Sequence, residues 1–201
     1  MRRKTFDALL STGGLIVAIV LAIAGGLLAW GHSFTENSVH NQLASQQIFF
    51  PDRAGITAQK NADITKYVTP YAGKQVVTGQ EAEVFADHYI ANHLKDVANG
   101  QTYSQVSGKF LTMKPTDPNY DTISQERQTL FQGETLRGLL LNAYAFGKVG
   151  QIAGVASIVS FIGAGVMFLL SGLGLVHTRR TKPDQELISW LNTPTKEPVR
   201  S

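Results

Sequence analysis

Two long apolar runs interrupt a chain that is otherwise rich in polar side chains. The first, ALLSTGGLIVAIVLAIAGGLLAW, occupies residues 8–30, in a segment that has no Asp, Glu, Lys or Arg between Asp7 and Glu36. The second, IAGVASIVSFIGAGVMFLLSGLGLV, lies in the charge-free segment 149–178. A helix crosses roughly 30 Å of hydrocarbon with about 20 apolar residues, at about 1.5 Å per residue. Each run therefore predicts one transmembrane helix.

The first run has a second interpretation, a removable secretory signal. Ala22, Ile23 and Ala24 resemble a small-residue cleavage site behind a basic start. However, the core of a signal peptide has roughly 7 to 15 apolar residues, whereas this run continues to Trp30. The length favours an uncleaved anchor.

The distribution of charge predicts the orientation of the two helices. The ends outside the apolar runs carry eight Lys and Arg against four Asp and Glu, and the central segment carries ten against eleven. Basic residues favour the cytoplasmic side, so both termini are expected in the cytoplasm and the protein in the cell membrane. The expected segments are a cytoplasmic N-terminus (1–7), a first span (8–31), an extracytoplasmic helical domain (32–148), a second span (149–177) and a cytoplasmic tail (178–201).

Composition limits what the central segment can do. The chain has 201 residues, a formal net charge of +3 and no cysteine. Without cysteine there are no disulfides, no thiol chemistry and no cysteine metal site, so packing must hold the domain together. No basic stripe interleaved with aromatic residues accompanies the positive charge, which argues against nucleic-acid binding.

Helical spacing recurs throughout the central segment. The first helix is expected to continue past Val39 and Leu43 until Pro51 stops it. Positions 64, 67, 68 and 71 predict a short helix interrupted near Pro70. The pair Thr78 and Glu81 matches the capping box that opens a helix.

The helix that begins at Thr78 is the clearest one in the central segment. Asn99 and Gly100 are expected to close it, because both tolerate a left-handed turn. Its predicted buried face is formed by apolar and aromatic residues at steps of three and four: Phe85, Tyr89, Ile90, His93, Leu94 and Val97.

The last helix of the domain is predicted to start near Asp121 or Thr122. From Gln132 to Gln151 no proline or polar loop separates it from the second span, which favours one continuous helix. The alternative is a short amphipathic helix that lies flat on the membrane and breaks near Gly147 or Gly150. The sequence leaves open whether residues 139–141 face the domain core, lipid or another chain.

Aromatic and basic residues mark the expected membrane boundaries. Lys148 can extend its side chain to the lipid headgroups, and Trp residues favour the interface. The predicted interfacial residues are Trp30, Lys148, Arg179, Arg180 and Trp190. Trp190 belongs to an apolar patch in the tail, together with Leu187, Ile188 and Leu191, which could bind the inner leaflet or a partner.

Small residues recur along both apolar runs. A row of small residues along one face of a helix lets a second helix backbone approach closely. The stripes predict helix packing through Gly14, Ala18, Ala22, Gly26, Gly150, Gly154, Ala156, Ser160 and Ala164. They do not distinguish pairing within the chain from pairing with a second chain.

No arrangement of residues in the sequence indicates catalysis, a metal site or a cofactor. His88 and His93 are five residues apart, a step that turns a helix by about 140° and separates the two rings. Phosphate-loop, dinucleotide and Gly-x-Ser-x-Gly motifs are missing from the sequence. Glu134 and Arg137 are expected to form a surface ion pair.

The stretches ANGQTYSQVS and TLFQGETLRGLLLNAYAF resemble a group of uncharacterised actinobacterial membrane proteins with two spans. The resemblance covers most of the chain and implies the same topology in a high-GC Gram-positive host. It implies no activity and no functional residue.

The fold class expected from these patterns is an all-α membrane protein, with two transmembrane helices flanking a mainly helical extracytoplasmic domain. The leading functional hypothesis is a non-enzymatic accessory subunit or scaffold that contacts the bilayer and a membrane-protein partner, or associates with itself. The alternative is a sensor or ligand-binding protein. A third hypothesis is an exported hydrolase or metalloenzyme.

Overall fold

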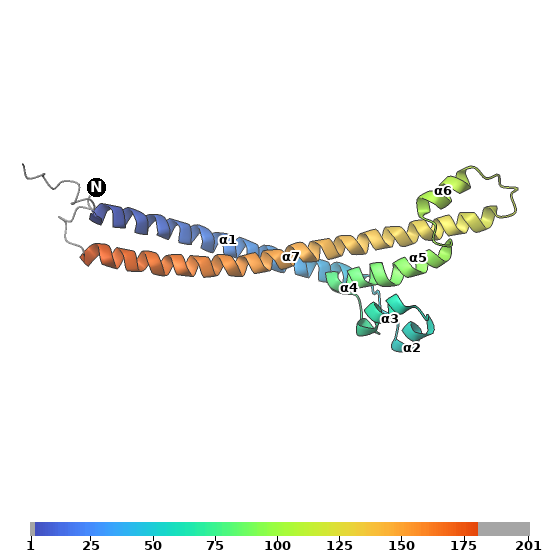
Figure 1. The fold of residues 1–201 in the computed structure, drawn as a ribbon, viewed down its shortest axis with the longest axis horizontal. Coiled ribbons are helices and arrows are strands. Elements are labelled where there is room, and N and C mark those ends of the chain that lie inside the picture. The colour runs from blue at the N-terminus through green and yellow to red at the C-terminus, as the bar shows by residue number, and fades with distance from the viewer. Residues whose placement is uncertain (1–2, 181–201) are drawn as a thin grey trace, which may run out of the picture. The chain divides into compact units, whose positions relative to one another are not determined.

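The computed structural model describes residues 3–180, and this part of the chain is helical (Figure 1). It contains no strand of a sheet, although one antiparallel β-bridge joins Phe49 to Gln75. The elements are α1 (Arg3–Ser45), α2 (Arg53–Ala58), α3 (Ala62–Val68), the 3-10 helix η1 (Thr69–Tyr71), α4 (Gly79–Val84), the π-helix η2 (Phe85–Ile90), α5 (Ala91–Val97), α6 (Tyr103–Leu111) and α7 (Tyr120–Arg180). The expected all-α class and the two long apolar helices are confirmed.

The chain divides into two compact units. One combines Met1–Trp30 with Ala153–Ser201, and its described part is residues 3–30 and 153–180. We call it the hairpin unit. The other, Gly31–Ile152, is the central unit.

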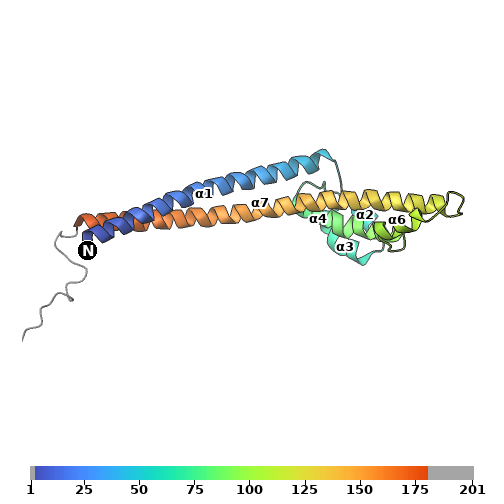
Figure 2. The same cartoon turned by 90° about the horizontal axis from the view of Figure 1, so that it is seen from above.

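In the hairpin unit, the apolar parts of α1 and α7 lie side by side (Figures 1 and 2). The helices are antiparallel, because Ser11 meets Gly174 whereas Gly25 meets Phe161. Buried positions recur every seven residues on both helices, which is the spacing of a coiled coil. They are Ser11, Ala18 and Gly25 on α1, and Ser157, Ala164, Ser171 and Thr178 on α7. We call these seven residues the seam.

Small side chains bring the two backbones of the seam close together. A Cβ atom added at Gly14 would collide with the Ser171 hydroxyl. The Ser157 Oγ donates a hydrogen bond of 2.9 Å to the Gly25 carbonyl oxygen, so this buried hydroxyl is satisfied across the pair. Large apolar side chains point away from the seam and are exposed, such as Leu27 at 65% and Leu169 at 71%.

The central unit has its own hydrophobic core. Both long helices contribute to it, α1 through Val39 and Leu43, and α7 through Leu130 and Leu140. The shorter elements pack the rest of the core between them: Phe50, Ile56, Ile64, Val68, Val76, Phe85, Ile90, Leu94 and Val106. The elements that carry the polar residues described below are therefore fixed by packing rather than by disulfides.

The end of α1 differs from the prediction. The helix was expected to reach Pro51 but ends at Ser45, and Gln47 takes a positive φ of 52°. Beyond this turn the backbone pairs with a distant segment, since the amide of Val76 donates to the Ile48 carbonyl at 2.8 Å. This pairing satisfies backbone groups that a longer helix would have used itself.

The helix predicted from Thr78 is present as α4, η2 and α5 in direct succession. Thr78 and Glu81 form the capping box, and Asn99 and Gly100 have φ values of 53° and 80°. Its buried face differs from the prediction, because His93 is exposed and Tyr89 and Val97 are only half-buried. The π-helix Phe85–Ile90 has a wider turn than an α-helix, which shifts the residues that follow it around the helix axis.

The other predicted elements agree with the structure. The helix around Pro70 is split into α3 and η1, as expected. The last helix begins at Tyr120 and runs without a break through Gln132–Gln151 to Arg180, so the flat amphipathic alternative is not the observed conformation. Within it, Leu140 is buried, Leu141 is half-buried and Leu139 is exposed.

Candidate functional site

The structure brings some of the predicted packing residues to the seam and leaves others beside it. Gly14 contacts α7, and Ala18 and Ala164 are buried. The half-buried residues are Ala22, Gly154, Ala156 and Ser160, and Gly150 lies in the central unit against Thr35. Gly26 is exposed, with no atom within 4 Å of an added Cβ. Successive four-residue steps drift around a helix of 3.6 residues per turn, which is why the stripe that begins at Gly14 leaves the seam.

Four of the predicted interfacial residues belong to the described part of the chain, where they lie near the ends of the apolar segments. Lys148 is half-buried, with its Nζ 5.5 Å from the centre of the Tyr144 ring and 3.3 Å from Gln151 Oε1. Arg179 and Arg180 are exposed in the last turn of α7, and Trp30 is exposed on α1. Trp190 and the rest of the apolar tail patch lie outside the described residues.

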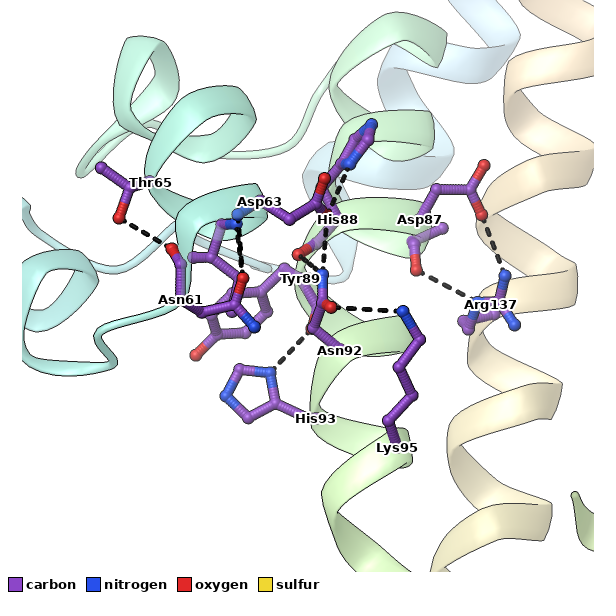
Figure 3. Close-up of polar contacts among 12 residues, drawn as sticks. Asn61, Asp63, Thr65, Asp87, His88, Tyr89, Asn92, His93, Lys95 and Arg137 are labelled. Carbon is purple, nitrogen blue, oxygen red and sulfur yellow. Dashed lines mark hydrogen bonds and ion pairs between the residues drawn. The ribbon is translucent and has the colours of Figure 1, made fainter. Parts of the chain in front are cut away.

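A polar network surrounds the π-helix in the central unit (Figure 3). Asp63, from the first turn of α3, accepts a hydrogen bond of 3.0 Å from His88 Nδ1 and one of 2.7 Å from Asn92 Nδ2. Asn92 also donates to the His88 carbonyl at 2.8 Å and is buried. The carboxylate of Asp63 therefore joins α3 to η2 and α5.

Two neighbours fix the position of this network. The Tyr67 ring stacks on the His88 imidazole, with their centroids 3.8 Å apart and an interplanar angle of 15°. Asn61 caps α3 by accepting hydrogen bonds from the amides of Asp63 and Ile64, at 2.9 and 3.1 Å. The cap sets the start of α3, and thus the place of Asp63.

On the other side of the π-helix, Arg137 connects η2 to α7 (Figure 3). Its Nε donates to the Ala86 carbonyl at 3.1 Å, and its two terminal nitrogens bond Asp87 at 3.0 Å and Glu134 at 2.8 Å. The ion pair with Glu134 agrees with the sequence prediction. Asp87 and Ala86 are additional partners that helical spacing could not reveal, since they are about 50 positions away in the chain.

The network affects the ionisation of Asp63. The hydrogen bond from His88 lowers the pKa of the Asp63 carboxyl below its usual value, the bond from Asn92 acts in the same direction, and burial partly opposes both. Within residues 3–180, no hydrogen bond joins a hydroxyl to His88, and no three His, Asp or Glu residues are arranged to hold a metal ion. The contacts of this network are those of a structural brace, with His88 oriented between a carboxylate and an aromatic ring.

Two hollows lie between α1 and α7 in the central unit. The first, which we call the polar cleft, has a volume of about 330 Å³. It is lined by Glu36, Asn37, Val39, His40, Val77, Thr78, Gly79, Gln80, Tyr144, Gly147, Lys148 and Gln151. Two of the lining residues are glycines that lie close together, since an added Cβ on Gly147 would lie 3.4 Å from the Gly79 Cα. An added Cβ on Gly79 would lie 3.1 Å from the Tyr144 Cα.

The second hollow, which we call the uncharged groove, has a volume of about 320 Å³. None of its lining residues carries a charge, and three of the apolar ones, Phe34, Leu139 and Phe146, are 57 to 60% exposed. The remaining lining residues are Thr35, Ser38, Val39, Gln42, Leu43, Gln46, Leu140, Asn142 and Ala143.

Comparison of this chain with protein-family models, curated proteins and solved structures gives no match.

Proposed function

We propose that this protein is a non-enzymatic accessory subunit or scaffold of a membrane complex, anchored in the cell membrane by both apolar helices. In this proposal the termini are cytoplasmic and the central unit lies outside the cytoplasm. The positive ends of the chain and the two charge-free runs support that orientation. The proposed host, from the sequence resemblance, is an actinobacterium.

The observation that carries the proposal is the uncharged groove. Leu139 and Phe146 on α7 and Phe34 on α1 expose large apolar side chains next to uncharged polar ones. Such a surface, without charged residues, is typical of sites that bind another helix. The seam supports the same function. Its small residues pack α1 against α7 within the chain, so the exposed apolar faces of both helices can contact lipid or a partner protein.

A mild-detergent purification of the full chain from its own host tests this proposal. We expect a stoichiometric membrane-protein partner to copurify, and the yield of that partner to fall about tenfold with Leu139→Gln, because a buried leucine contributes roughly 1.5–3 kcal/mol. Leu111→Gln is the matched control, since Leu111 is 77% exposed and lies outside the groove. A chain that purifies alone as a monomer contradicts the proposal, and so does equal loss in both variants.

A sensor is the second candidate function, favoured by the continuity of the helices. α1 and α7 each run as one helix from the hairpin unit into residues of the central core, such as Leu43 and Leu130. A ligand bound by the central unit could thus act on elements that also form the spans. In that case a ligand should raise the thermal midpoint of the detergent-solubilised full chain. If no ligand in a screen shifts the thermal midpoint and a partner protein copurifies, the sensor role is refuted and the accessory role remains.

A further inference from the structure

Two opposite charges line the polar cleft, and both mark a membrane boundary in the sequence. Glu36 is the first charged residue after the first apolar run, and Lys148 is the last charged residue before the second. If both runs span the bilayer, these residues lie at the level of the lipid headgroups, which extend for several ångströms beyond the hydrocarbon on each side. The cleft is therefore a hollow in the central unit at headgroup depth.

The partners of these two residues leave their charges available to a ligand. Within the described residues Lys148 makes no ion pair, and its nearest polar contact is the neutral amide of Gln151 at 3.3 Å. Glu36 is 55% exposed, and one of its oxygens is 3.6 Å from His32 Nε2. The Nδ1 of His32 is within 2.9 Å of the Gly150 carbonyl oxygen, and this hydrogen bond holds the imidazole ring in place beside Glu36.

The geometry points to a zwitterionic phospholipid headgroup with a primary amine, of the phosphoethanolamine type, as the ligand of the polar cleft. We propose that Lys148 binds its phosphate and that Glu36 accepts hydrogen bonds from its ammonium group. Charge-assisted hydrogen bonds of both kinds are about twice as strong as neutral ones. A headgroup with only a negative charge would pair with Lys148 but would be repelled by the Glu36 carboxylate. A choline headgroup has no N–H that could donate a hydrogen bond to Glu36.

Other residues of the cleft suit a polar ligand of this size. The Tyr144 hydroxyl can donate a hydrogen bond in the 330 Å³ volume, and so can the second N–H of the Gln80 amide, whose first is bonded to Glu83. The Thr78 hydroxyl is bonded to the Glu81 carboxylate. The backbone amides of Val77 and Thr78 are already bonded to the Glu81 carboxylate, so they do not contribute to anion binding. The acyl chains of the lipid would remain outside the cleft, in the bilayer. This inference rests on the proposed membrane insertion.

Native mass spectrometry of the full chain, released from membranes of defined composition, tests the inference. With equal amounts of ethanolamine, choline and glycerol phospholipids, we expect the wild type to retain the ethanolamine lipid preferentially. Glu36→Gln should reduce that preference over the glycerol lipid about tenfold, the effect of losing one charge-assisted hydrogen bond. Lys148→Gln should reduce retention of all three lipids. Glu126→Gln and Lys109→Gln are charge-matched controls away from the cleft and should change neither quantity.

Equal retention of the three lipids by the wild type, or unchanged retention in both cleft variants, overturns the inference. Phosphoethanolamine in solution separates the two sources of this headgroup. If it protects the wild type from thermal unfolding as strongly as the lipid does, with the same loss in the variants, the ligand is a free metabolite and the lipid assignment is wrong. Carbonate extraction of host membranes distinguishes failure of the proposed anchoring from failure of the lipid site. If carbonate removes the protein, membrane anchoring is refuted. If the protein stays in the membrane and the cleft variants retain lipid like the wild type, only the lipid site is refuted.

Discussion

At the scale of single residues, Gly79 is the described glycine that other backbone atoms approach most closely. An added Cβ would meet the Tyr144 Cα at 3.1 Å and the Ala143 carbonyl oxygen at 3.2 Å, and both are backbone atoms that cannot rotate away. We therefore expect Gly79→Ala to separate α4 from α7 and to lower the free energy of unfolding by about 1–3 kcal/mol. Chemical denaturation of the full chain in detergent measures this change.

Gly138→Ala is the matched control for that variant. Gly138 lies in α7, is exposed and has no atom within 4 Å of an added Cβ. Alanine is the better helix former, by about 0.8–1 kcal/mol, so this variant should be neutral or slightly more stable. If the two alanine variants behaved alike, the close approach at Gly79 would have no energetic significance.

Asp63 makes stability depend on pH in a defined window. Because the pKa of Asp63 is lowered in the folded state by its bond from His88, its contribution is fully present above the unfolded pKa of about 3.8 and is lost as pH falls through the folded pKa. Asp63→Asn should be less stable than the wild type at pH 6, and the difference should shrink below about pH 4.

Thermal unfolding midpoints of the two proteins between pH 6 and pH 2 test this expectation. The side chain of Asp63 is 42% exposed, so solvent screening should keep the effect small. A difference that stays constant over the whole range would show that Asp63 acts through its shape and neutral hydrogen bonds, and not through its charge.

Individual residues were predictable from the sequence where their partners are local. The capping box of Thr78 and Glu81 and the pair of Glu134 and Arg137 involve neighbours within one turn of helix, and both are present. The bond of His88 to Asp63 joins positions 25 apart, and helical spacing contains no information about such a pair. The π-helix also has no sequence signature, which is why the exposure of His93 was missed.

At the scale of elements, the seam of the hairpin unit is open to a direct test because the chain has no cysteine. A Cβ added at Gly14 would lie 3.7 Å from the Ser171 Cβ, and disulfides have a mean Cβ separation of about 3.8 Å. We expect Gly14→Cys with Ser171→Cys to form a disulfide within one chain upon oxidation, detected by faster migration on non-reducing gels.

The pair Gly13→Cys with Gly172→Cys is the control for the seam. Both glycines are exposed and have no neighbouring atom within 4 Å of an added Cβ. Disulfide-linked dimers from the Gly14 and Ser171 variant, in place of the intramolecular product, would mean that the small residues pair between two chains.

The long helices themselves were predictable, and their contact register was not. The length of the apolar runs and the absence of proline from them were sufficient to predict α1 and the continuity of α7. The buried residues of the seam recur every seven positions, whereas the stripe predicted from Gly14 to Gly26 has uniform steps of four. Small residues are common on several faces of an apolar helix, so composition alone does not show which face packs.

At the scale of the whole molecule, the proposed topology has a simple labelling test. In the cysteine-free chain, a cysteine in place of Ser104, which is exposed on α6, should react in intact cells with a thiol reagent that cannot cross membranes. A cysteine in place of Ser201 should react only after the membrane is opened. The reverse pattern would invert the orientation, and labelling of both sites in intact cells would refute two complete spans.

The small side chains of the seam also have a consequence for conformational entropy. Fixing a long side chain costs up to about 2 kcal/mol in lost rotamers, whereas glycine and alanine lose almost none. Ala18, Gly25 and Ala164 therefore become buried with nearly no loss of side-chain freedom, while the leucines and isoleucines on the outer faces of the hairpin unit remain able to rotate. The two helices can thus associate with their most mobile side chains left unordered.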